Sequence, residues 1–290
     1  MDKTALFQKL EKIHNLPTLP MIIDKLGKAV HDPNSNAKQI AAIIEDDPSM
    51  MARILKVVNS AFYGVSEPIH SVHHAVARMG LLAVNNIAMS TAVFSTFGKK
   101  GQTDFNREEF WRHSISCGLA CNVLYQRCKS NIRTKPGKDI LHLCGLLHDI
   151  GKIVFEQFFH AEFIHAVKLA KEKKIPLFQA EAEVMGADHS EVGAWLGQRW
   201  NLSEEVVDVI RWHHDPPKGK PDFLSLISIC HIGNYICNLE KIGESGDSCA
   251  PAFMHPVWKQ LGLAVQDIAD IVDEVKEEAK HSEILLSFVS

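Results

Sequence analysis

The chain has 290 residues, of which 46% are hydrophobic and 23% are charged. These proportions are typical of globular proteins and exclude disordered, collagen-like and low-complexity chains. Asp and Glu number 35 against 31 Lys and Arg, which gives a formal net charge of -4. A chain with this balance has no overall cationic field to attract phosphate backbones, so we do not expect a nucleic-acid partner.

Cysteine usage and hydropathy bear on location. The seven cysteines include no C-x-x-C pair, which argues against a zinc ribbon. An odd number of cysteines without a signal-peptide pattern is typical of a reducing compartment, so we expect a cytoplasmic protein. The most apolar stretch, Leu81 to Phe94, contains Asn85 and Asn86 and is too short to span a bilayer. We therefore expect no membrane association.

Helical periodicity runs through nearly the whole chain. Apolar residues recur at three- and four-residue spacings, and alternation with period two is scarce. Residues that commonly cap helices precede several of these patterns. These residues are Asn36, Asp47, Ser71, Asn106, Asp188 and Ser203. We predict roughly twelve to fourteen helices and an all-α fold.

Polar and glycine- or proline-bearing runs mark the expected loops. The run 98–104 separates two long helical patterns and predicts a domain boundary. We expect a helical N-terminal subdomain at 1–100 and a helical bundle with a C-terminal extension at 101–290. Further loops are expected at 130–137, 215–221 and 243–251.

Histidine is over-represented, with 16 residues. Imidazole is a frequent metal ligand, and those histidines with suggestive neighbours all follow residue 105. They are His113, His148 beside Asp149, His189, and the pair His213 and His214. Neutral imidazoles with a carboxylate suit Fe, Mn, Zn or Ni, and a carboxylate can bridge two such ions.

Each of these features also has an ordinary structural explanation. Asp149 and Lys152 have the spacing of an ion pair on a helix surface, and His213 lies where it could complement a helix dipole. Glu109 could be the glutamate of a capping box begun by Asn106. Their joint occurrence in one half of the chain is what favours a site.

The order of these residues resembles the HD superfamily of metal-dependent phosphohydrolases, and the richer set resembles its HD-GYP branch of cyclic-dinucleotide phosphodiesterases. The resemblance implies metal ligation by His113, His148, Asp149, His189, His213 and His214. It adds Glu109, four residues before the first histidine, and Lys152, three residues after the aspartate. In an enzyme of this type, Asp149 and Lys152 would be catalytic.

Two departures from that pattern argue against cyclic-dinucleotide cleavage. Where the superfamily has a late aspartate ligand, this chain offers Asn234, a neutral and weaker ligand. His231, nearly one turn earlier, is the candidate substitute. The Gly-Tyr-Pro signature expected after the paired histidines is absent, and the chain reads Asp-Pro-Pro-Lys at 215–218.

The N-terminal half resembles a narrower family. LPTLP at 16–20, QIAAIIEDDPSMMARILKVVNSAFYG at 39–64 and IHSVHHAVARMG at 69–80 are similar to the HDOD family, the HD-related output domain of bacterial signalling proteins. The likeness continues through GLLHDIGKIVFEQ and GADHSEVGAWLGQRW and covers about residues 13 to 240. It implies an all-helical output module, in which the N-terminal apolar residues pack a core. Asn59 and Tyr63 could instead face the histidine-bearing half or a partner.

We therefore expect a bacterial signal-transduction output protein with a retained HD pocket that binds one or two divalent transition metal ions. It would act mainly by binding a signalling protein or a small nucleotide-like ligand. The alternative is a metal-dependent phosphohydrolase acting on a nucleotide or another phosphoester, and a third reading makes the histidines a metal-free relic. Cys117 and Cys121 continue the helical face of His113 and could line its cavity, but packing as small apolar residues explains them better.

Overall fold

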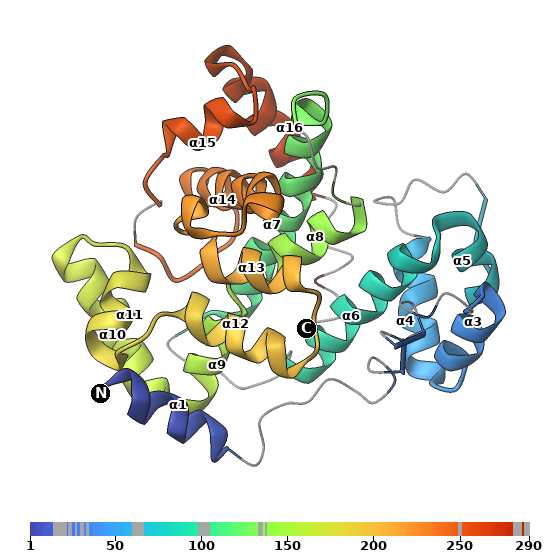
Figure 1. Cartoon of the computed structure of the whole chain (residues 1–290), viewed down its shortest axis with the longest axis horizontal. Coiled ribbons are helices and arrows are strands. Elements are labelled where there is room, and N and C mark those ends of the chain that lie inside the picture. The colour runs from blue at the N-terminus through green and yellow to red at the C-terminus, as the bar shows by residue number, and fades with distance from the viewer. Residues whose placement is uncertain are drawn as a thin grey trace. The chain divides into compact units, whose positions relative to one another are not determined.

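The computed structural model describes residues 1–13, 22, 25–26, 28–29, 32, 35–59, 67–97, 105–132, 136, 138–248, 251–280 and 286. All regular structure in these ranges is helical (Figure 1), which confirms the all-α prediction. The Leu-Pro motif at 16–20, Tyr63 and the expected boundary loop at 98–104 lie outside the described residues. Within the described part, no helix is both long and apolar enough to cross a membrane.

The chain divides into two compact units. One comprises Met1–Leu16 and Gly101–Lys280, and the other comprises Pro17–Lys100 and His281–Ser290. The terminal segments therefore group differently from the expected division at 1–100 and 101–290. The first helix, α1 (Lys3–Glu11), packs with the later unit because Leu6 and Leu10 are fully buried there and the Phe7 ring lies 6.1 Å from that of Trp195.

In the unit that contains residues 17–100, several of the described helices begin at capping residues that the sequence shows. Its described helices are α3 (Ala37–Glu45), α4 (Pro48–Val58), α5 (Val72–Met79) and α6 (Leu81–Phe97). Asn36 forms a capping box with Gln39, and the Asp47 carboxylate caps α4 ahead of Pro48. The Asn59 amide donates to the carbonyls of Leu55 and Ile69 and accepts from the Ile69 amide. Asn59 thus joins the end of α4 to the segment before α5.

The other unit contains the predicted site. Its helices are α7 (Arg107–Cys128), α8 (Lys138–Leu147), α9 (Ile150–Phe158), α10 (His160–Lys173), α11 (Leu177–Met185), α12 (His189–Arg199), α13 (Glu204–Trp212), α14 (Leu224–Leu239), α15 (His255–Gln260) and α16 (Ile268–Lys280). Short 3-10 turns cover Pro216–Lys218, Pro221–Phe223 and Val265–Asp267. Helix α7 is the central element, because α8, α14 and α16 all pack on it (Figure 1). The C-terminal extension therefore covers the helix that carries His113.

Two glycine contacts bring the site-bearing helices together. A Cβ on Gly151 of α9 would lie 2.0 Å from the carbonyl oxygen of His189, and one on Gly145 of α8 would lie 2.5 Å from the amide nitrogen of Gly118. Real atoms cannot approach so closely, so a side chain at either position would force the backbones apart. The absence of a side chain at Gly151 lets the first turn of α9 lie directly against the start of α12.

Candidate metal centre

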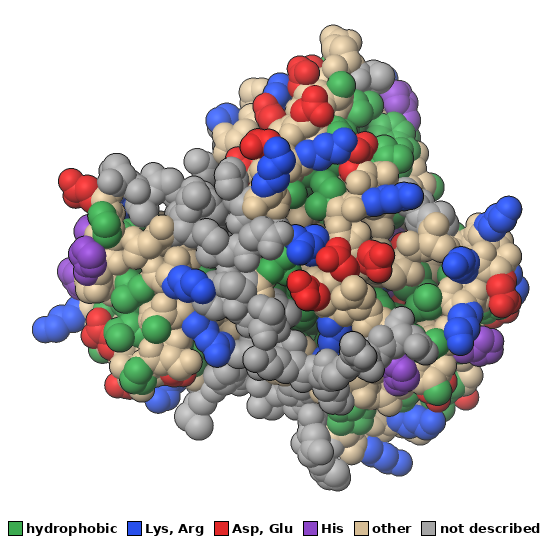
Figure 2. Space-filling view, turned by 180° about the vertical axis from the view of Figure 1, so that it is seen from behind, with side chains coloured by type: hydrophobic (Ala, Val, Ile, Leu, Met, Phe, Trp, Pro, Cys, Tyr) green, Lys and Arg blue, Asp and Glu red, His purple; other side chains and the backbone are tan. Residues whose placement is uncertain are grey.

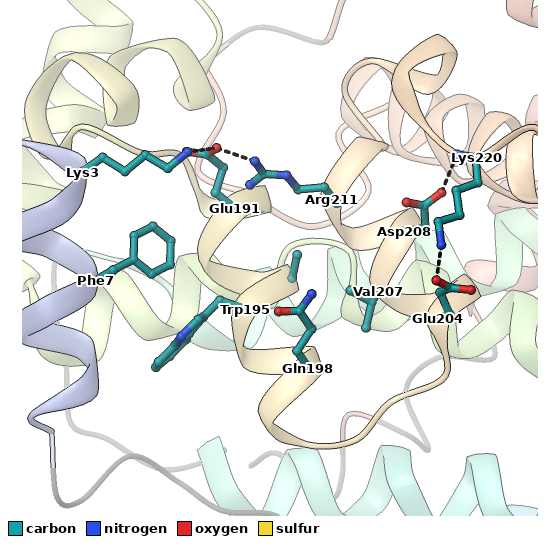
Figure 3. Close-up of a pocket in the computed structure, with 11 residues that line it drawn as sticks. Lys3, Phe7, Glu191, Trp195, Gln198, Glu204, Val207, Asp208, Arg211 and Lys220 are labelled. Carbon is teal, nitrogen blue, oxygen red and sulfur yellow. Dashed lines mark hydrogen bonds and ion pairs between the residues drawn. The ribbon is translucent and has the colours of Figure 1, made fainter.

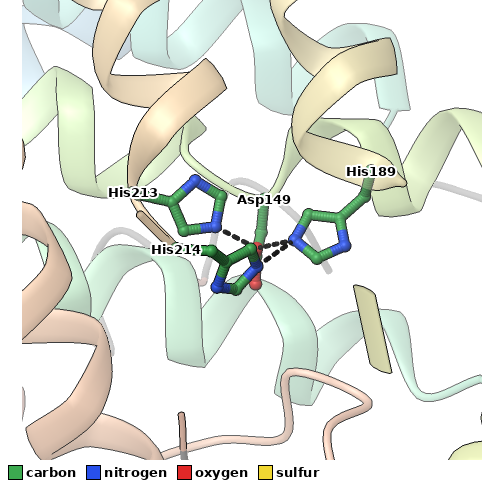
Figure 4. Close-up of side chains that lie close together, drawn as sticks. All are labelled: Asp149, His189, His213 and His214. Carbon is green, nitrogen blue, oxygen red and sulfur yellow. Dashed lines mark hydrogen bonds and ion pairs between the residues drawn. The ribbon is translucent and has the colours of Figure 1, made fainter. Parts of the chain in front are cut away.

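The structure brings the predicted histidine and aspartate ligands into one cluster. His113 comes from α7, His148 and Asp149 from the turn between α8 and α9, His189 from the first residue of α12, and His213 and His214 from the end of α13. Figure 4 shows Asp149 with His189, His213 and His214 turned toward one another. All of these side chains have no exposed surface except that of His214, which is partly buried.

Asp149 lies at the centre of the cluster, and its two oxygens face different histidines. Oδ1 is 3.0 Å from Nε2 of His189 and 3.5 Å from Nε2 of His213. Oδ2 is 3.3 Å from Nε2 of His148 and 4.0 Å from Nε2 of His113. These side chains offer two sets of donor atoms, and within each set all the atoms lie within 4.8 Å of one another. They are Asp149, His189, His213 and His214 in one set, and His113, Cys117 and His148 in the other.

Backbone carbonyls orient two of the rings. Nδ1 of His148 lies 2.7 Å from the Gly145 oxygen, and Nδ1 of His213 lies 2.9 Å from the Ile210 oxygen. A carbonyl oxygen only accepts, so each Nδ1 carries the proton and each Nε2 presents a lone pair to the cluster. Both Nε2 atoms are buried without a hydrogen-bond partner. Converging lone pairs of this kind are costly unless a cation binds them, so the donor set fits a metal ion.

Glu181 orients a third ring. Its Oε2 accepts from Nδ1 of His189 at 2.6 Å and from the His189 backbone amide at 2.8 Å, and the carboxylate is fully buried. Burial alone would lower the pKa of His189, but the carboxylates of Glu181 and Asp149 outweigh it and raise that pKa to about 10. A carboxylate bound to the outer nitrogen of a ligand histidine is a common feature of metal sites.

Lys152 is buried between two carboxylates. Its Nζ lies 2.7 Å from Oδ2 of Asp149 and 2.7 Å from Oδ2 of Asp247. Burial opposes its charge, yet the two carboxylates hold its pKa above the ordinary range. The same pairing, with nearby imidazoles, keeps the pKa of Asp149 well below its ordinary range despite burial. The single ammonium therefore offsets part of the charge of Asp149 and Asp247.

Three other histidines of the cluster have lowered pKa values, which favour the neutral imidazole that binds a metal. Burial, with the neighbouring His148, lowers the pKa of His113 to about 3. Burial likewise lowers the pKa of His213 to about 4 and holds that of His214 well below its usual value. The ring of His214 stacks on Phe178 of α11, with centroids 4.4 Å apart and planes at 22°. Phe178 thus covers the one ligand that is partly exposed.

A separate pocket of about 460 Å³ is lined by residues of α1, α12 and α13 together with Lys220 (Figure 3). Its apolar lining includes Phe7, Trp195 and Val207, and ion pairs cross its rim. Glu191 accepts from Lys3 of α1 and from Arg211 of α13, each at 2.6 Å. Helix α12 therefore carries His189 of the cluster at its start and residues of the pocket one and two turns later.

Comparisons with known proteins identify the family. A family model described as the HDOD domain matches residues 16–216. The chain belongs to the HDOD family.

Two relatives illustrate the likeness in sequence and in fold. An uncharacterized protein of Treponema pallidum (strain Nichols) is 28% identical over 224 residues, which cover 77% of this chain but only 42% of that protein. A solved HDOD domain protein of unknown function from Geobacter sulfurreducens is 25% identical, with a TM-score of 0.74 over 95% of this chain and 97% of its own. The chain thus spans less than half of its Treponema relative.

Two more solved structures share the HDOD fold at lower identity. A candidate signal transduction protein from Marinobacter aquaeolei VT8 is 22% identical, with a TM-score of 0.77 over 97% of this chain and 61% of its own. A candidate phosphohydrolase from Shewanella amazonensis SB2B is 21% identical, with a TM-score of 0.72 over 99% of this chain and 98% of its own. At these identities the likeness shows the fold alone.

The structure does not bring Glu109 into the cluster of histidines around Asp149. Its carboxylate is 32% exposed and accepts from Nε of Arg112 at 3.1 Å, while its amide donates to the Asn106 side chain. Asn106 thus caps the helix through the Glu109 amide, but the Glu109 carboxylate pairs with Arg112 instead of completing a capping box, and it belongs to neither donor set of the described residues. Its carboxylate is instead held by Arg112, three residues later on α7.

Asn234 and His231 of α14 take different places. Oδ1 of Asn234 lies 3.1 Å from Nε2 of His113. Asn234 is thus beside the cluster, as expected of the neutral residue that replaces the late aspartate ligand of the HD superfamily. Nδ1 of His231 lies 2.7 Å from the carbonyl oxygen of His213. His231 is thus oriented by the backbone that follows α13, and it belongs to neither donor set of the described residues, so its role as a substitute ligand stays a prediction.

Sequence reasoning missed Glu181 and Asp247. Glu181 lies eight residues before His189 on the preceding helix, and Asp247 lies 95 residues after Lys152. Neither spacing corresponds to a helical turn or a known motif, so the only signal was a carboxylate within an otherwise apolar or small-residue stretch. Their roles depend on how α11 and the segment after α14 pack against the cluster of histidines around Asp149.

Proposed function

We propose that this chain is a signal-transduction output protein whose buried pocket holds a divalent transition metal and which acts by binding a protein partner or a small nucleotide-like ligand. The observation that carries the proposal is the convergence of buried, unpartnered Nε2 atoms of His148 and His213 on Asp149. Fe, Mn, Zn and Ni all suit imidazole and carboxylate donors. The signal-transduction name of the Marinobacter structure agrees with such a role.

The enclosure of the donors favours a binding role over turnover. A catalytic metal needs an open position for water or substrate. Here His113, His148, Asp149, His189 and His213 have no exposed surface, and Phe178 stacks on His214, the one partly exposed donor. In addition, the Lys152 ammonium binds two carboxylates and is not free to offset charge on a phosphate. A metal in this setting would stabilise the arrangement of α7, α9, α12 and α13.

The pocket beside α12 and α13 offers a way for metal occupancy to affect binding. His189 and Glu191 lie two residues apart on α12, and Arg211 precedes His213 by two residues at the end of α13. The Glu191–Arg211 ion pair joins these helices at 2.6 Å (Figure 3). A change in the spacing of the two helix ends at the cluster would therefore move the rim of the pocket.

The surface agrees with a protein or small-molecule partner. On the face in Figure 2, basic and acidic side chains are interspersed among the described residues. Electrostatic specificity toward proteins uses such mixed patterns, whereas nucleic-acid binding depends on a concentrated basic surface.

The test is metal content followed by ligand binding. We expect protein purified without a histidine tag to contain about one transition metal ion per chain or more, because buried donor sets of this kind bind metal as they fold. His148→Ala and Asp149→Ala should lose the metal, while His165→Ala, at an exposed position on α10, should retain it. Metal-free wild type after aerobic and anaerobic purification would contradict the proposal.

Calorimetry separates a binding role from an enzymatic one. A panel of nucleotides, titrated into metal-loaded and metal-stripped protein, should include one that binds the two forms with different affinity and is recovered intact. Turnover of that nucleotide, abolished by Asp149→Ala, would overturn the binding-only role.

A second candidate is a metal-dependent phosphohydrolase acting on a nucleotide or another phosphoester. It is favoured by the way each oxygen of Asp149 faces a different donor set, as in a carboxylate that bridges two metals. Bound metals would lower the pKa of a coordinated water and polarise the phosphoryl group. Nucleotides and generic phosphoesters incubated with Mn²⁺ or Fe²⁺ test this candidate, and inertness of the metal-loaded protein across that panel would exclude it.

A further inference from the structure

A thiol stands among the donors at the His113 end of the cluster. Cys117 follows His113 by one turn of α7, and its Sγ lies 3.4 Å from Nε2 of His113. His148 completes this donor set, and its Nε2 is buried without a hydrogen-bond partner. Cys117 and both histidines have no exposed surface. The thiol is therefore fixed beside two imidazoles, one of which presents an unused lone pair.

This end of the cluster lacks a negative charge of its own. Asn234 contributes a neutral amide, whose Oδ1 lies 3.1 Å from Nε2 of His113 and accepts from Nδ2 of Asn238 at 2.5 Å. Asp149 is the only carboxylate near both imidazoles in the described part of the cluster, and it also faces His189 and pairs with Lys152. A divalent ion bound here would have little compensating charge unless Cys117 supplied it.

The spacing suits shared ligation. Zinc binds sulfur at about 2.3 Å and imidazole nitrogen at about 2.0 Å in tetrahedral geometry, which places the two donor atoms about 3.5 Å apart. The observed separation of Sγ and Nε2 is 3.4 Å. Without a metal this is the length of a thiol–imidazole hydrogen bond, and a zinc ion could bind the same two atoms without moving them apart.

We propose that Cys117 is a metal ligand, binding as a thiolate together with His113 and His148 and supplying the charge that Asn234 lacks. On binding, the S–H bond breaks, a sulfur–metal bond forms and the proton passes to solvent, with no change of oxidation state. Thiolate ligation makes the site prefer Zn²⁺, Co²⁺ or Fe²⁺ to the harder Mn²⁺. The inference deepens the proposed function and rests on its metal binding.

Cys121 provides a matched control. It lies one turn beyond Cys117 on α7 and is also buried. Its sulfur faces α14 near Gly233, where a Cβ would lie 3.5 Å from it, and it is absent from the donor set of His113 and His148. Cys121→Ser therefore makes the same change in the same helix without touching the proposed ligand.

Cobalt substitution tests the proposal with a signal that does not depend on activity. Titration of the metal-stripped 290-residue chain with Co²⁺ should produce a near-ultraviolet sulfur-to-cobalt charge-transfer band in the wild type and in Cys121→Ser. Cys117→Ser should lose that band while still binding Co²⁺ through the histidine-rich donor set. Its zinc affinity relative to manganese should fall by at least about tenfold.

Each other result is decisive. Cobalt binding without the band in the wild type, or a band that persists in Cys117→Ser, overturns the ligand role of Cys117 and leaves metal binding intact. The absence of cobalt binding overturns the proposed function as well. X-ray absorption of the zinc-loaded wild type needs no variant, and it should show a zinc–sulfur distance of about 2.3 Å. Nitrogen and oxygen scatterers alone would refute the proposal even if Cys117→Ser failed to fold.

Restoring the missing carboxylate provides a second check. In Cys117→Ser, the added change Asn234→Asp should recover zinc affinity without restoring the charge-transfer band, because Asn238 can donate to the new carboxylate as it does to the amide. Failure to recover affinity would indicate that charge is not what Cys117 contributes.

Discussion

Glu181 binds His189 through two hydrogen bonds to a single oxygen, one from the ring at 2.6 Å and one from the backbone amide at 2.8 Å. The amide is one of the unpaired donors at the start of α12, so Glu181 satisfies the helix end and orients the ring together. With Nδ1 bound in this way, Nε2 faces Asp149 at 3.0 Å. Glu181 of α11 thus determines the direction in which the His189 ring faces.

Glu181→Gln should weaken metal binding by about 10–100-fold, because the amide keeps the shape of the side chain but removes the charge that supports His189 as a donor. Competition with a chromophoric chelator measures the affinity. Glu183→Gln is the control, since Glu183 lies on the same helix, is exposed and pairs with Lys173 at 2.6 Å. Equal affinities in the two variants would contradict the role of Glu181.

Lys152→Met should destabilise the metal-free protein by about 3–5 kcal/mol, because it leaves the buried carboxylates of Asp149 and Asp247 without their cation. Urea unfolding monitored by circular dichroism measures the free energy of unfolding. Lys173→Met removes an exposed ion pair and should cost about 0–1 kcal/mol. Adding Asp247→Asn to Lys152→Met should recover part of the loss, and a purely additive result would show that the two groups are not coupled.

Gly151→Ala should both destabilise the protein and reduce metal affinity. The new Cβ would meet the backbone oxygen of His189 at 2.0 Å, so α9 and α12 must separate and carry Asp149 and His189 apart. Gly197→Ala is the matched control on α12, since its Cβ would make ordinary contacts starting at 3.4 Å. Alanine is favoured over glycine within a helix by about 1 kcal/mol, so the control should be neutral or stabilised. Unchanged metal affinity in Gly151→Ala would refute this account.

Acid should destabilise the protein partly through His142, which is not in the cluster and packs against Gly118 of α7. Burial lowers the pKa of His142 from 6.5 to about 4. Between these values the unfolded chain binds more protons than the folded one, so stability falls as the pH drops from about 6.5 toward 4 and levels off below. The full effect is about 3 kcal/mol.

Unfolding of the wild type and His142→Gln across this pH range measures that contribution. The variant should show a shallower fall in the free energy of unfolding, by up to the share of His142, whatever its stability at neutral pH. Parallel curves for the two proteins would mean that His142 does not titrate differently in the folded and unfolded states.

The N-terminal ends of helices were accessible from sequence because caps are local. Asn36, Asp47, Ser71, Asn106 and Asp188 all accept hydrogen bonds from the first turns of the helices they were expected to begin. Ser203 precedes α13 without a side-chain cap bond. The grouping of α1 with the later unit was not accessible, because it depends on a contact between Phe7 and Trp195, which lie far apart in the sequence.

The sequence by itself determined the all-α class, the HDOD family and the residue types available as ligands, because helical periodicity, caps and ordered motifs are local properties of the chain. Only the tertiary structure decided which donors meet: it joined His113 to Cys117 and Asn234, placed Glu181 behind His189, and left Glu109 at the surface with Arg112. The physical reason is that ligation depends on distances of a few ångströms between separate helices. Those distances are set by packing, down to a glycine without a side chain at position 151.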